Sequence, residues 1–258
     1  MITLAYEHAY DVILCNSLQL MSWMHGAGIP YEKLLHVPNA PGHPVNRALR
    51  ENILAKRQSL DSGRLNVLYL GRLDRQKGMD RLAELVQRTQ DLGLPMDWRI
   101  VGSSVNRDSA VPIVLEQLRE PAVFDSSDLA SLFGWADVMV LLSDFEGVPL
   151  SILEAQRLGV VVIATDVGAV SEIVSDGRNG FLVQPETAVE QTISLLKLLL
   201  DVPALRAKIA DAASQVKEWP ETTLELMERI TDLVNSARAT RPQFDLVPGA
   251  RAEFSRVQ

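Results

Sequence analysis

The stretch from Val138 to Glu154, VMVLLSDFEGVPLSILE, joins an apolar run to a loop and then to a helical pattern. Val138–Leu142 is a short continuous apolar run, which is typical of a strand buried on both faces. Pro149 fits the first position of a helix, because its missing N–H would have no partner there in any case. The stretch therefore predicts a strand, a loop that carries Glu146, and a helix over Pro149–Leu158.

The same alternation continues on both sides of this stretch. Further strands are expected at Val67–Leu70, Trp98–Val101, Val160–Ala164 and Phe181–Val183, with a weaker one at Val123-Phe124. Helices are expected between them at Met79–Leu92, Pro112–Arg119, Asp128–Trp135 and Val170–Ser175. This order predicts an α/β fold, a parallel sheet with helices on both faces, in which ligands bind beyond the carboxyl ends of the strands.

The flanking segments suggest a chain of four parts. Residues 1–64 offer only strands at Asp11–Cys15 and Leu34–Val37, a helix at Ser17–Gly26 and a proline-rich loop, as expected for the remnant of an N-terminal acceptor-side domain plus a linker. Residues 65–185 form the sheet domain, and residues 186–239 read as helices at Thr187–Leu200, Pro203–Trp219 and Glu221–Ala237, with a break marked by Pro220. Residues 240–258 are expected to be an extended tail.

Composition narrows the function classes. The 258 residues carry a net charge of −8, which argues against a general nucleic-acid surface. A single cysteine excludes an internal disulfide framework, and four histidines without clustered cysteines give no zinc pattern. No apolar run is long enough to span a bilayer and no signal-peptide pattern follows Met1, so we expect a cytoplasmic protein, with peripheral membrane contact left open.

Carboxylates and backbone amides gather around the predicted helix start. The N–H groups over Val148–Ser151, together with the helix dipole, would form an anion site suited to a diphosphate. Gly147 would let a ligand approach the backbone. Glu154 lies about one and a half turns into the helix, where its carboxylate could accept hydrogen bonds from two ribose hydroxyls. Glu146 would then face the sugar side of the phosphates.

Basic residues follow the strand that ends at Leu70. Arg72 could clamp phosphate oxygens in bidentate fashion, while Lys77 would act as a point charge. Gly71 would allow a sharp turn. Gly102, at the end of the next strand, could bring its backbone to a ligand or serve only as a tight strand exit.

A plainer interpretation stays open for each of these features. Glu146 could merely complement the helix dipole, and Glu154 could be a solvated helix residue. Arg72 and Lys77 could belong to an ordinary charged loop, since the pattern is neither a Walker phosphate loop nor a Gly-x-Gly-x-x-Gly fingerprint. The four histidines, His8, His25, His36 and His43, are expected to be structural or exposed rather than catalytic.

Taken in order, the motifs resemble the C-terminal, donor-binding half of a retaining GT-B glycosyltransferase of family 4, also called group 1. Glu146 and Glu154 stand eight residues apart (154 − 146), as in the family's Glu-x7-Glu motif. The resemblance covers roughly residues 65–185. Its motifs are GRLxxxKG (71–78), ADV (136–138), SxxEG (143–147), LEA (153–155), GVV (159–161), ATDVG (164–168), EIV (172–174) and DGxxGFLV (176–183).

The resemblance implies a function and roles. It implies transfer of a hexose-type sugar from a nucleotide diphosphate sugar to an unknown acceptor (a carbohydrate, lipid or protein), with retained anomeric configuration, no bound metal and no other cofactor. The implied catalytic residues are Glu146, Arg72 and Lys77. The implied donor-binding residues are Gly71, Gly102, Gly147, Val148, Pro149, Leu150, Ser151 and Glu154.

The chain departs from the family at its front half, because a GT-B enzyme has two Rossmann-like domains and only a remnant of the first is visible here. We therefore expect enzyme activity only with an N-terminal domain or partner chain. A catalytically inactive nucleotide-sugar-binding or assembly module is the alternative, and a nucleotide-sugar epimerase of the same architecture is a third hypothesis. The base, the sugar and the acceptor stay open.

Overall fold

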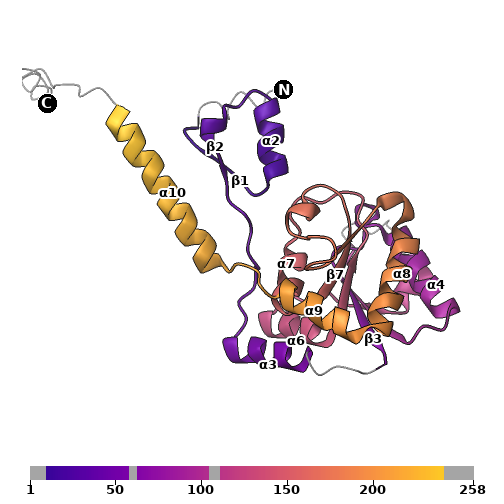
Figure 1. Cartoon of the computed structure of the whole chain (residues 1–258). Helices are drawn as coiled ribbons and strands as arrows, with labels where there is room; N and C mark the ends of the chain where they lie inside the picture. The colour runs from indigo at the N-terminus through magenta and orange to yellow at the C-terminus, as the bar shows by residue number, and fades with distance from the viewer. Residues whose placement is uncertain (1–9, 58–62, 105–110, 241–258) are drawn as a thin grey trace, which may run out of the picture. The chain divides into compact units, whose positions relative to one another are not determined.

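The computed structural model describes residues 10–57, 63–104 and 111–240, and within these ranges it forms a six-stranded parallel sheet in the order β5-β4-β3-β6-β7-β8 (Figure 1). The chain adds β4 and β5 on one side of β3, then returns past β3 and adds β6, β7 and β8 on the other side. The direction of winding thus reverses between β3 and β6. The strands are β3 (Leu65–Leu70), β4 (Met96–Val101), β5 (Arg119–Glu120), β6 (Val138–Leu141), β7 (Val161–Thr165) and β8 (Phe181–Val183).

Helices cover both faces of this sheet, as the sequence predicts. On one face α4 contacts both α5 and α8, and on the other α9 contacts α3, α7 and β7 (Figure 1). Every residue of β6 and β7 is buried, because helices cover both of their faces. The helices are α3 (Arg47–Arg57), α4 (Met79–Asp91), α5 (Ile113–Glu116), α6 (Ser126–Trp135), α7 (Leu150–Arg157), α8 (Ala188–Asp201) and α9 (Pro203–Ala213).

The N-terminal segment forms a small parallel unit. β1 (Ile13–Cys15) pairs with β2 (Leu34–His36), and α2 (Leu18–Gly26) and the 3-10 turn η1 (Tyr31–Lys33) connect them. Cys15, Ile29 and Leu34 make its own buried cluster. The predicted strands and helix of this segment are confirmed.

The helix α3 has no counterpart in the sequence prediction. Asn46 begins it, since Asn46 Oδ1 accepts hydrogen bonds from the N–H groups of Ala48 and Leu49 at 2.9 and 3.3 Å. At its far end, Arg57 donates to the carbonyl oxygens of Phe133 and Ala136 at 2.6 and 2.8 Å. Burial lowers the pKa of Arg57 to about 10. These bonds offset the burial of the guanidinium and fix α3 to the end of α6.

Three predicted elements differ from the structure. The strand expected at Val123-Phe124 is wrong, because the edge strand is β5, which pairs with the end of β4. The helix expected over Pro112–Arg119 is shorter, since Arg119 is already in that strand. The turn at η3 (Val170–Glu172) replaces the helix expected over Val170–Ser175.

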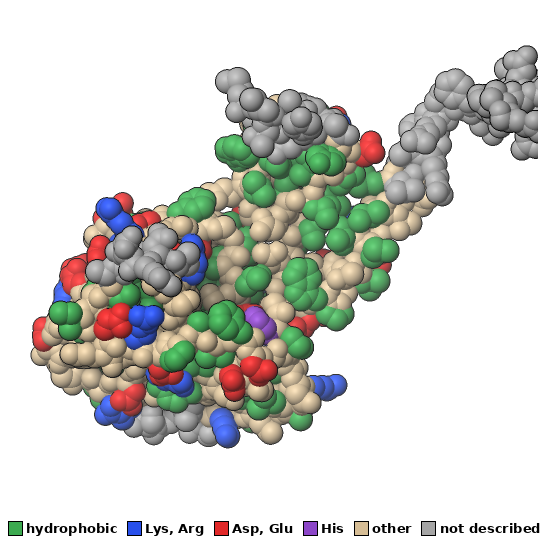
Figure 2. Space-filling view, turned by 180° about the vertical axis from the view of Figure 1, so that it is seen from behind, with side chains coloured by type: hydrophobic (Ala, Val, Ile, Leu, Met, Phe, Trp, Pro, Cys, Tyr) green, Lys and Arg blue, Asp and Glu red, His purple; other side chains and the backbone are tan. Residues whose placement is uncertain are grey.

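The C-terminal helices follow after the 3-10 turn η4 (Pro185–Thr187), and the break between the last two lies earlier than predicted. α9 ends at Ala213, and α10 (Trp219–Thr240) begins just before Pro220, where a proline is tolerated in the first turn. The chain divides into compact units at residues 1–222 and 223–258, whereas the finer domain boundaries stay predictions. Figure 2 shows apolar side chains along α10, and Leu224 and Met227 are among its exposed residues. Over the described ranges, no helix combines the length and apolarity that crossing a membrane requires.

Candidate functional site

The candidate site lies where the winding of the sheet reverses, beyond the carboxyl ends of β3 and β6. In doubly wound sheets this crevice binds ligands, because the loops that follow the two strands diverge to opposite faces. Here the loop after β3 runs through η2 (Arg75–Lys77) to Gly78, and the loop after β6 runs from Leu142 to Pro149. The sequence placed its basic residues on the first loop and its acidic residues on the second.

The two loops touch through their backbones. The N–H of Asp144 donates to the carbonyl oxygen of Gln76 at 2.8 Å. Gly78 has a φ of 71° in the left-handed region, and a Cβ there would overlap the carbonyl oxygen of Leu142. Glycine is therefore required twice over at this position, by conformation and by space. Arg81 extends the contact by donating to Leu142 O at 2.6 Å and pairing with the Asp144 carboxylate.

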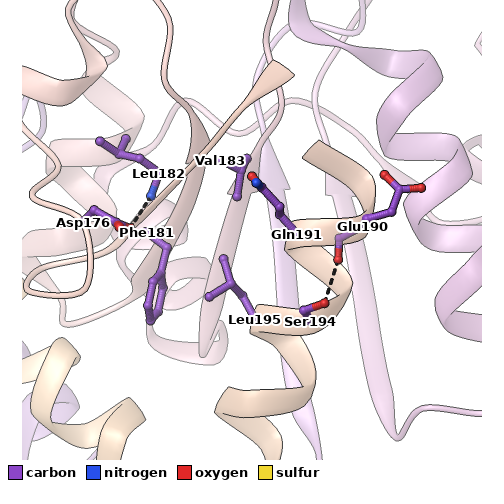
Figure 3. A pocket seen from close by; sticks show the side chains of 8 residues that line it. All are labelled: Asp176, Phe181, Leu182, Val183, Glu190, Gln191, Ser194 and Leu195. Atoms are coloured by element: carbon purple, nitrogen blue, oxygen red, sulfur yellow. Dashed lines mark hydrogen bonds between the residues drawn. The ribbon is translucent and has the colours of Figure 1, made fainter. Parts of the chain in front are cut away.

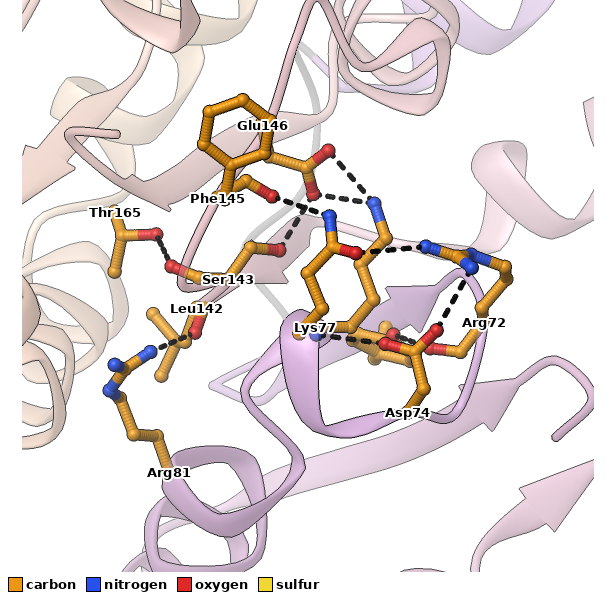
Figure 4. A network of polar contacts seen from close by, with 11 residues as sticks. Arg72, Asp74, Lys77, Arg81, Leu142, Ser143, Phe145, Glu146 and Thr165 are labelled. Carbon is orange, nitrogen blue, oxygen red and sulfur yellow. Dashed lines mark hydrogen bonds and ion pairs between the residues drawn. The ribbon is translucent and has the colours of Figure 1, made fainter. Parts of the chain in front are cut away.

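Lys77 and Glu146 form an ion pair at the centre of this contact (Figure 4). Lys77 Nζ lies 2.6 Å from Oε1 and 2.8 Å from Oε2 of the carboxylate, and Ser143 Oγ donates to Oε1 at 2.7 Å. The Glu146 side chain is 7% exposed and that of Lys77 is 15% exposed. The hydroxyl of Thr165, at the end of β7, holds the carbonyl oxygen of Ser143 at 2.7 Å. The pair is thus nearly buried, so Glu146 does more than complement a helix dipole.

A third loop packs against the backbone of Glu146. Gly168, after β7, has a φ of 58°, and a Cβ there would overlap the carbonyl oxygen of Glu146. The close approach of these backbones fixes where residue 146 sits.

Arg72 stands at the open side of the network. Its side chain is 49% exposed and pairs with Asp74 at 3.1 Å, and Nη2 donates to Gln76 Oε1 at 3.4 Å (Figure 4). Tyr69 supports this turn by donating to the carbonyl oxygen of Arg72. Burial, and then the nearby carboxylates of Asp74 and Glu146, raise the pKa of the Tyr69 hydroxyl. Tyr69 therefore stays a neutral donor, and Arg72 remains half exposed at this edge of the network.

The glycines predicted for the site lie at the same edge of the sheet. The N–H of Gly71 donates to Val101 O at 3.1 Å, and Gly102 packs against the carbonyl group of Gly71. A Cβ at Gly147 would meet no atom within 4 Å, so the backbone there is open to a ligand.

The start of α7 differs slightly from the prediction. Pro149 is the N-cap rather than the first helical residue, because its ψ of 114° is extended, and the helix begins at Leu150. Pro149 supplies no side-chain cap. The N–H groups of Leu150 and Ser151 belong to the first turn of α7, where amides have no partner within the helix. The anion site expected over Val148–Ser151 stays a prediction.

Glu154 is not a solvated helix residue. Its side chain is 7% exposed, and Oε1 lies 2.5 Å from His43 Nδ1. His43 was expected only to be structural or exposed, because its contact with Glu154 joins residues 111 positions apart and no local pattern indicates it.

The described part of the chain has one pocket beside the β6–α7 loop and another at the edge strand β8. The first, of about 470 Å³, is lined by Trp23 and its neighbours on α2 and by Phe145 and Gly147 of the β6–α7 loop. The second, also about 470 Å³, lies between β8 and α8, with Phe181 and Gln191 in its lining (Figure 3). Only the first adjoins the loop that carries Glu146.

Comparison with known sequences gives relatives of the expected kind. An uncharacterized 41.2 kDa protein in the cps region of Klebsiella pneumoniae is 32% identical over 178 residues, which cover 69% of this chain and 49% of the relative. A D-inositol 3-phosphate glycosyltransferase of Arthrobacter sp. (strain FB24) is 32% identical over 186 residues, which cover 65% of this chain and 42% of the relative. The chain thus spans less than half the length of these curated relatives.

Solved structures confirm the fold. Sucrose-phosphate synthase from Thermosynechococcus elongatus has a TM-score of 0.71 at 21% identity, over 92% of this chain and 61% of that one. Anabaena HepE in complex with UDP and glucose also has a TM-score of 0.71, at 20% identity, over 89% and 66% of the two chains. The C-terminal domain of LpcC, a group 1 protein of Francisella tularensis, has a TM-score of 0.52 at 25% identity, over 77% and 96%.

The predicted Rossmann-like, GT-B C-terminal architecture is therefore confirmed. The family model described as Glycosyl transferases group 1 matches residues 51–216. That range is more than half of the 258 residues and contains all three loops around Glu146. The chain belongs to the group 1 glycosyltransferases.

Proposed function

We propose that this chain is the donor-binding part of a retaining glycosyltransferase that transfers a hexose-type sugar from a nucleotide diphosphate sugar to an acceptor. The observation that carries the proposal is the Lys77–Glu146 pair, held at 2.6 Å where the winding of the sheet reverses, beside the open start of α7. A cation, a carboxylate and free helix amides in one crevice fit a ligand that has both phosphates and hydroxyls. The solved relative HepE, crystallised with UDP-glucose, supports a donor of this class.

In this proposal the diphosphate lies between the basic loop and α7. Arg72, which is half exposed, would bind phosphate oxygens in bidentate fashion, and Lys77 would share its charge between Glu146 and the phosphates. The amides at the start of α7 would complete the anion site. We propose that these groups, rather than a metal ion, supply the positive charge.

The hydroxyl-binding groups would be the two glutamates of the motif. Glu146 would accept hydrogen bonds from the donor sugar, and Glu154 from the nucleoside ribose. Both carboxylates are nearly buried and already hold donors, so they are fixed before a ligand arrives. Preorganised acceptors of this kind lose little conformational freedom on binding.

The chemical contribution of the site would be stabilisation of the leaving diphosphate. As the glycosidic bond breaks, negative charge grows on the phosphate oxygen, and Arg72 and Lys77 would oppose it. Loss of one such preorganised contact raises a barrier by about 2–4 kcal/mol. Because the chain spans less than half of its curated relatives, transfer itself would need the acceptor-side domain of a longer chain or a partner. The cytoplasmic location stays a prediction.

Titration calorimetry tests the proposal. The folded chain is titrated with UDP, GDP and ADP and with their glucose conjugates, and at least one pair is expected to bind. Lys77→Met should weaken that binding about tenfold or more, since a hydrogen bond to a charged group contributes about 1.5–3 kcal/mol. Arg47→Met is the matched control, because Arg47 is 92% exposed on α3 and pairs with Glu51.

Failure of the folded chain to bind any of these nucleotides would refute the proposal. Equal affinity in the wild type and Lys77→Met would refute the role given to the basic loop. Sugar transfer is measured separately with an acceptor-side domain present, because binding alone does not distinguish a transferase from a nucleotide-sugar-binding module.

A further inference from the structure

The proline-rich segment between β2 and α3 lies across the first two turns of α7. A Cβ at Gly42 would lie 3.1 Å from Glu154 Oε1 and 3.6 Å from Leu150 Cδ1, so the backbone of this segment packs directly on the helix. The next residue, His43, places Nδ1 2.5 Å from Glu154 Oε1. Gly42 and His43 together therefore form a strap over Glu154.

A buried arginine of α7, Arg157, holds the strap in place. Arg157, three positions after Glu154 and so on the same face of α7, donates to the carbonyl oxygen of His43. Its side chain is 5% exposed and also pairs with Glu218 at 3.1 Å. The backbone and the ring of His43 are thus held by two different residues of one helix.

Burial shows what a ligand would meet. The His43 side chain is 41% exposed, whereas that of Glu154 is 7% exposed. His43 is therefore the partner of this pair that solvent reaches more readily. The Glu154 carboxylate can still accept hydrogen bonds from a ligand, because a carboxylate has about four acceptor positions and His43 uses one.

The chemistry fixes the direction of the contact. An ionised carboxylate only accepts hydrogen bonds, so Nδ1 of His43 carries the proton and donates it to Oε1. A donor held in this way sets the rotation of the carboxylate. We propose that His43 is a positioning residue for nucleoside recognition, which orients Glu154 so that the carboxylate selects a ribose with two hydroxyls. This inference rests on the proposed function.

The test compares ribonucleotides with their 2′-deoxy counterparts. UDP, GDP and ADP, and 2′-deoxy-UDP, 2′-deoxy-GDP and 2′-deoxy-ADP, are titrated into the wild type, His43→Ala and His43→Asn. The asparagine amide places a donor near the position of Nδ1, so His43→Asn is the conservative rescue. His25→Asn, which alters a histidine of α2 bonded to Ile29 O, is the control for histidine replacement. Circular dichroism confirms that each variant is folded.

The wild type is expected to prefer the ribonucleotide by about tenfold or more, because a site built for a hydroxyl rejects the ligand that lacks it. His43→Ala should weaken ribonucleotide binding about tenfold and deoxynucleotide binding much less, so the preference collapses. His43→Asn should restore most of it, and His25→Asn should match the wild type.

Three results would overturn the inference. An equal loss for both sugars in His43→Ala would give His43 a purely structural role. Tighter ribonucleotide binding in His43→Ala would make the ring a competitor of the ribose instead of its helper. Absence of binding to the wild type would overturn the proposed function and this inference with it, whereas either of the first two results overturns the inference alone.

Discussion

The Lys77–Glu146 pair offers the most direct test of how this site is built. Lys77→Met removes the charge and keeps the length of the side chain, which leaves the Glu146 carboxylate, 7% exposed, with Ser143 as its donor at 2.7 Å. Removing one partner of a buried pair costs about 3–5 kcal/mol. Because the Ser143 hydroxyl remains, we expect Lys77→Met to lower the free energy of unfolding by about 3 kcal/mol, the low end of that range.

Glu146→Gln removes the opposite charge and keeps the shape. Lys77 is 15% exposed and retains an amide oxygen as acceptor, so this variant should lose less, about 1.5 kcal/mol. In the double variant neither charge is left buried. It should be no less stable than Lys77→Met, which corresponds to a coupling free energy of about 1.5 kcal/mol between the two residues.

The assay is equilibrium unfolding in urea, followed by circular dichroism, on the wild type, both single variants and the double variant. Lys197→Met on α8 is the control, because Lys197 is exposed there, and an exposed substitution of this kind changes stability by less than about 0.5 kcal/mol. A measured coupling below about 0.5 kcal/mol would refute the reasoning, since it would mean that the two charges are stabilised independently of one another.

Three further predictions concern the frame around the site. Gly78→Ala should lower the free energy of unfolding by more than about 2 kcal/mol, whereas Gly93→Ala, also at positive φ but with open space around it, should lower it by only about 1 kcal/mol. Similar losses for the two variants in urea unfolding would contradict the close packing of the loops. Arg57→Met should lower the free energy of unfolding by about 2–3 kcal/mol, because three backbone carbonyl groups lose a charged donor, whereas Arg47→Met should leave it unchanged. An unchanged urea midpoint for Arg57→Met would show that α3 is not fixed in this way. Cys15 is fully buried and burial raises the pKa of its thiol, so a disulfide reagent should modify it only after urea is added; rapid modification in buffer would show that the N-terminal unit is not formed.

The positions of the main strands along the chain could be predicted because each strand consists of contiguous residues. Every residue of β6 and β7 is buried, as is the middle of β3 at Val67–Tyr69, so these strands give uninterrupted apolar patterns. The edge strand β5 has no such pattern, since it consists of Arg119 and Glu120 and exists only because the end of β4 pairs with it. A strand was predicted instead at Val123-Phe124 because both residues are apolar, although Phe124 is 81% exposed in the structure.

The site could be predicted in part for the same reason. Glu146, Lys77 and Glu154 belong to short motifs, and the loops that carry them follow strands whose carboxyl ends share one edge of the sheet. That reasoning brings the residues to one crevice without saying which of them touch. It gave no sign that Lys77 is bound to Glu146 before any ligand arrives, or that Pro149 caps α7.

By itself, then, the sequence determined the alternation of strands and helices, the edge of the sheet at which polar residues collect, and the family. These depend on local spacing and on the handedness that every parallel crossover shares. Only the tertiary structure decided that His43 contacts Glu154, 111 positions away, and that Gly78 and Gly168 allow three loops to pack closely around residue 146. Contacts of this kind arise from the packing of backbones and side chains far apart in the chain, for which no local pattern exists.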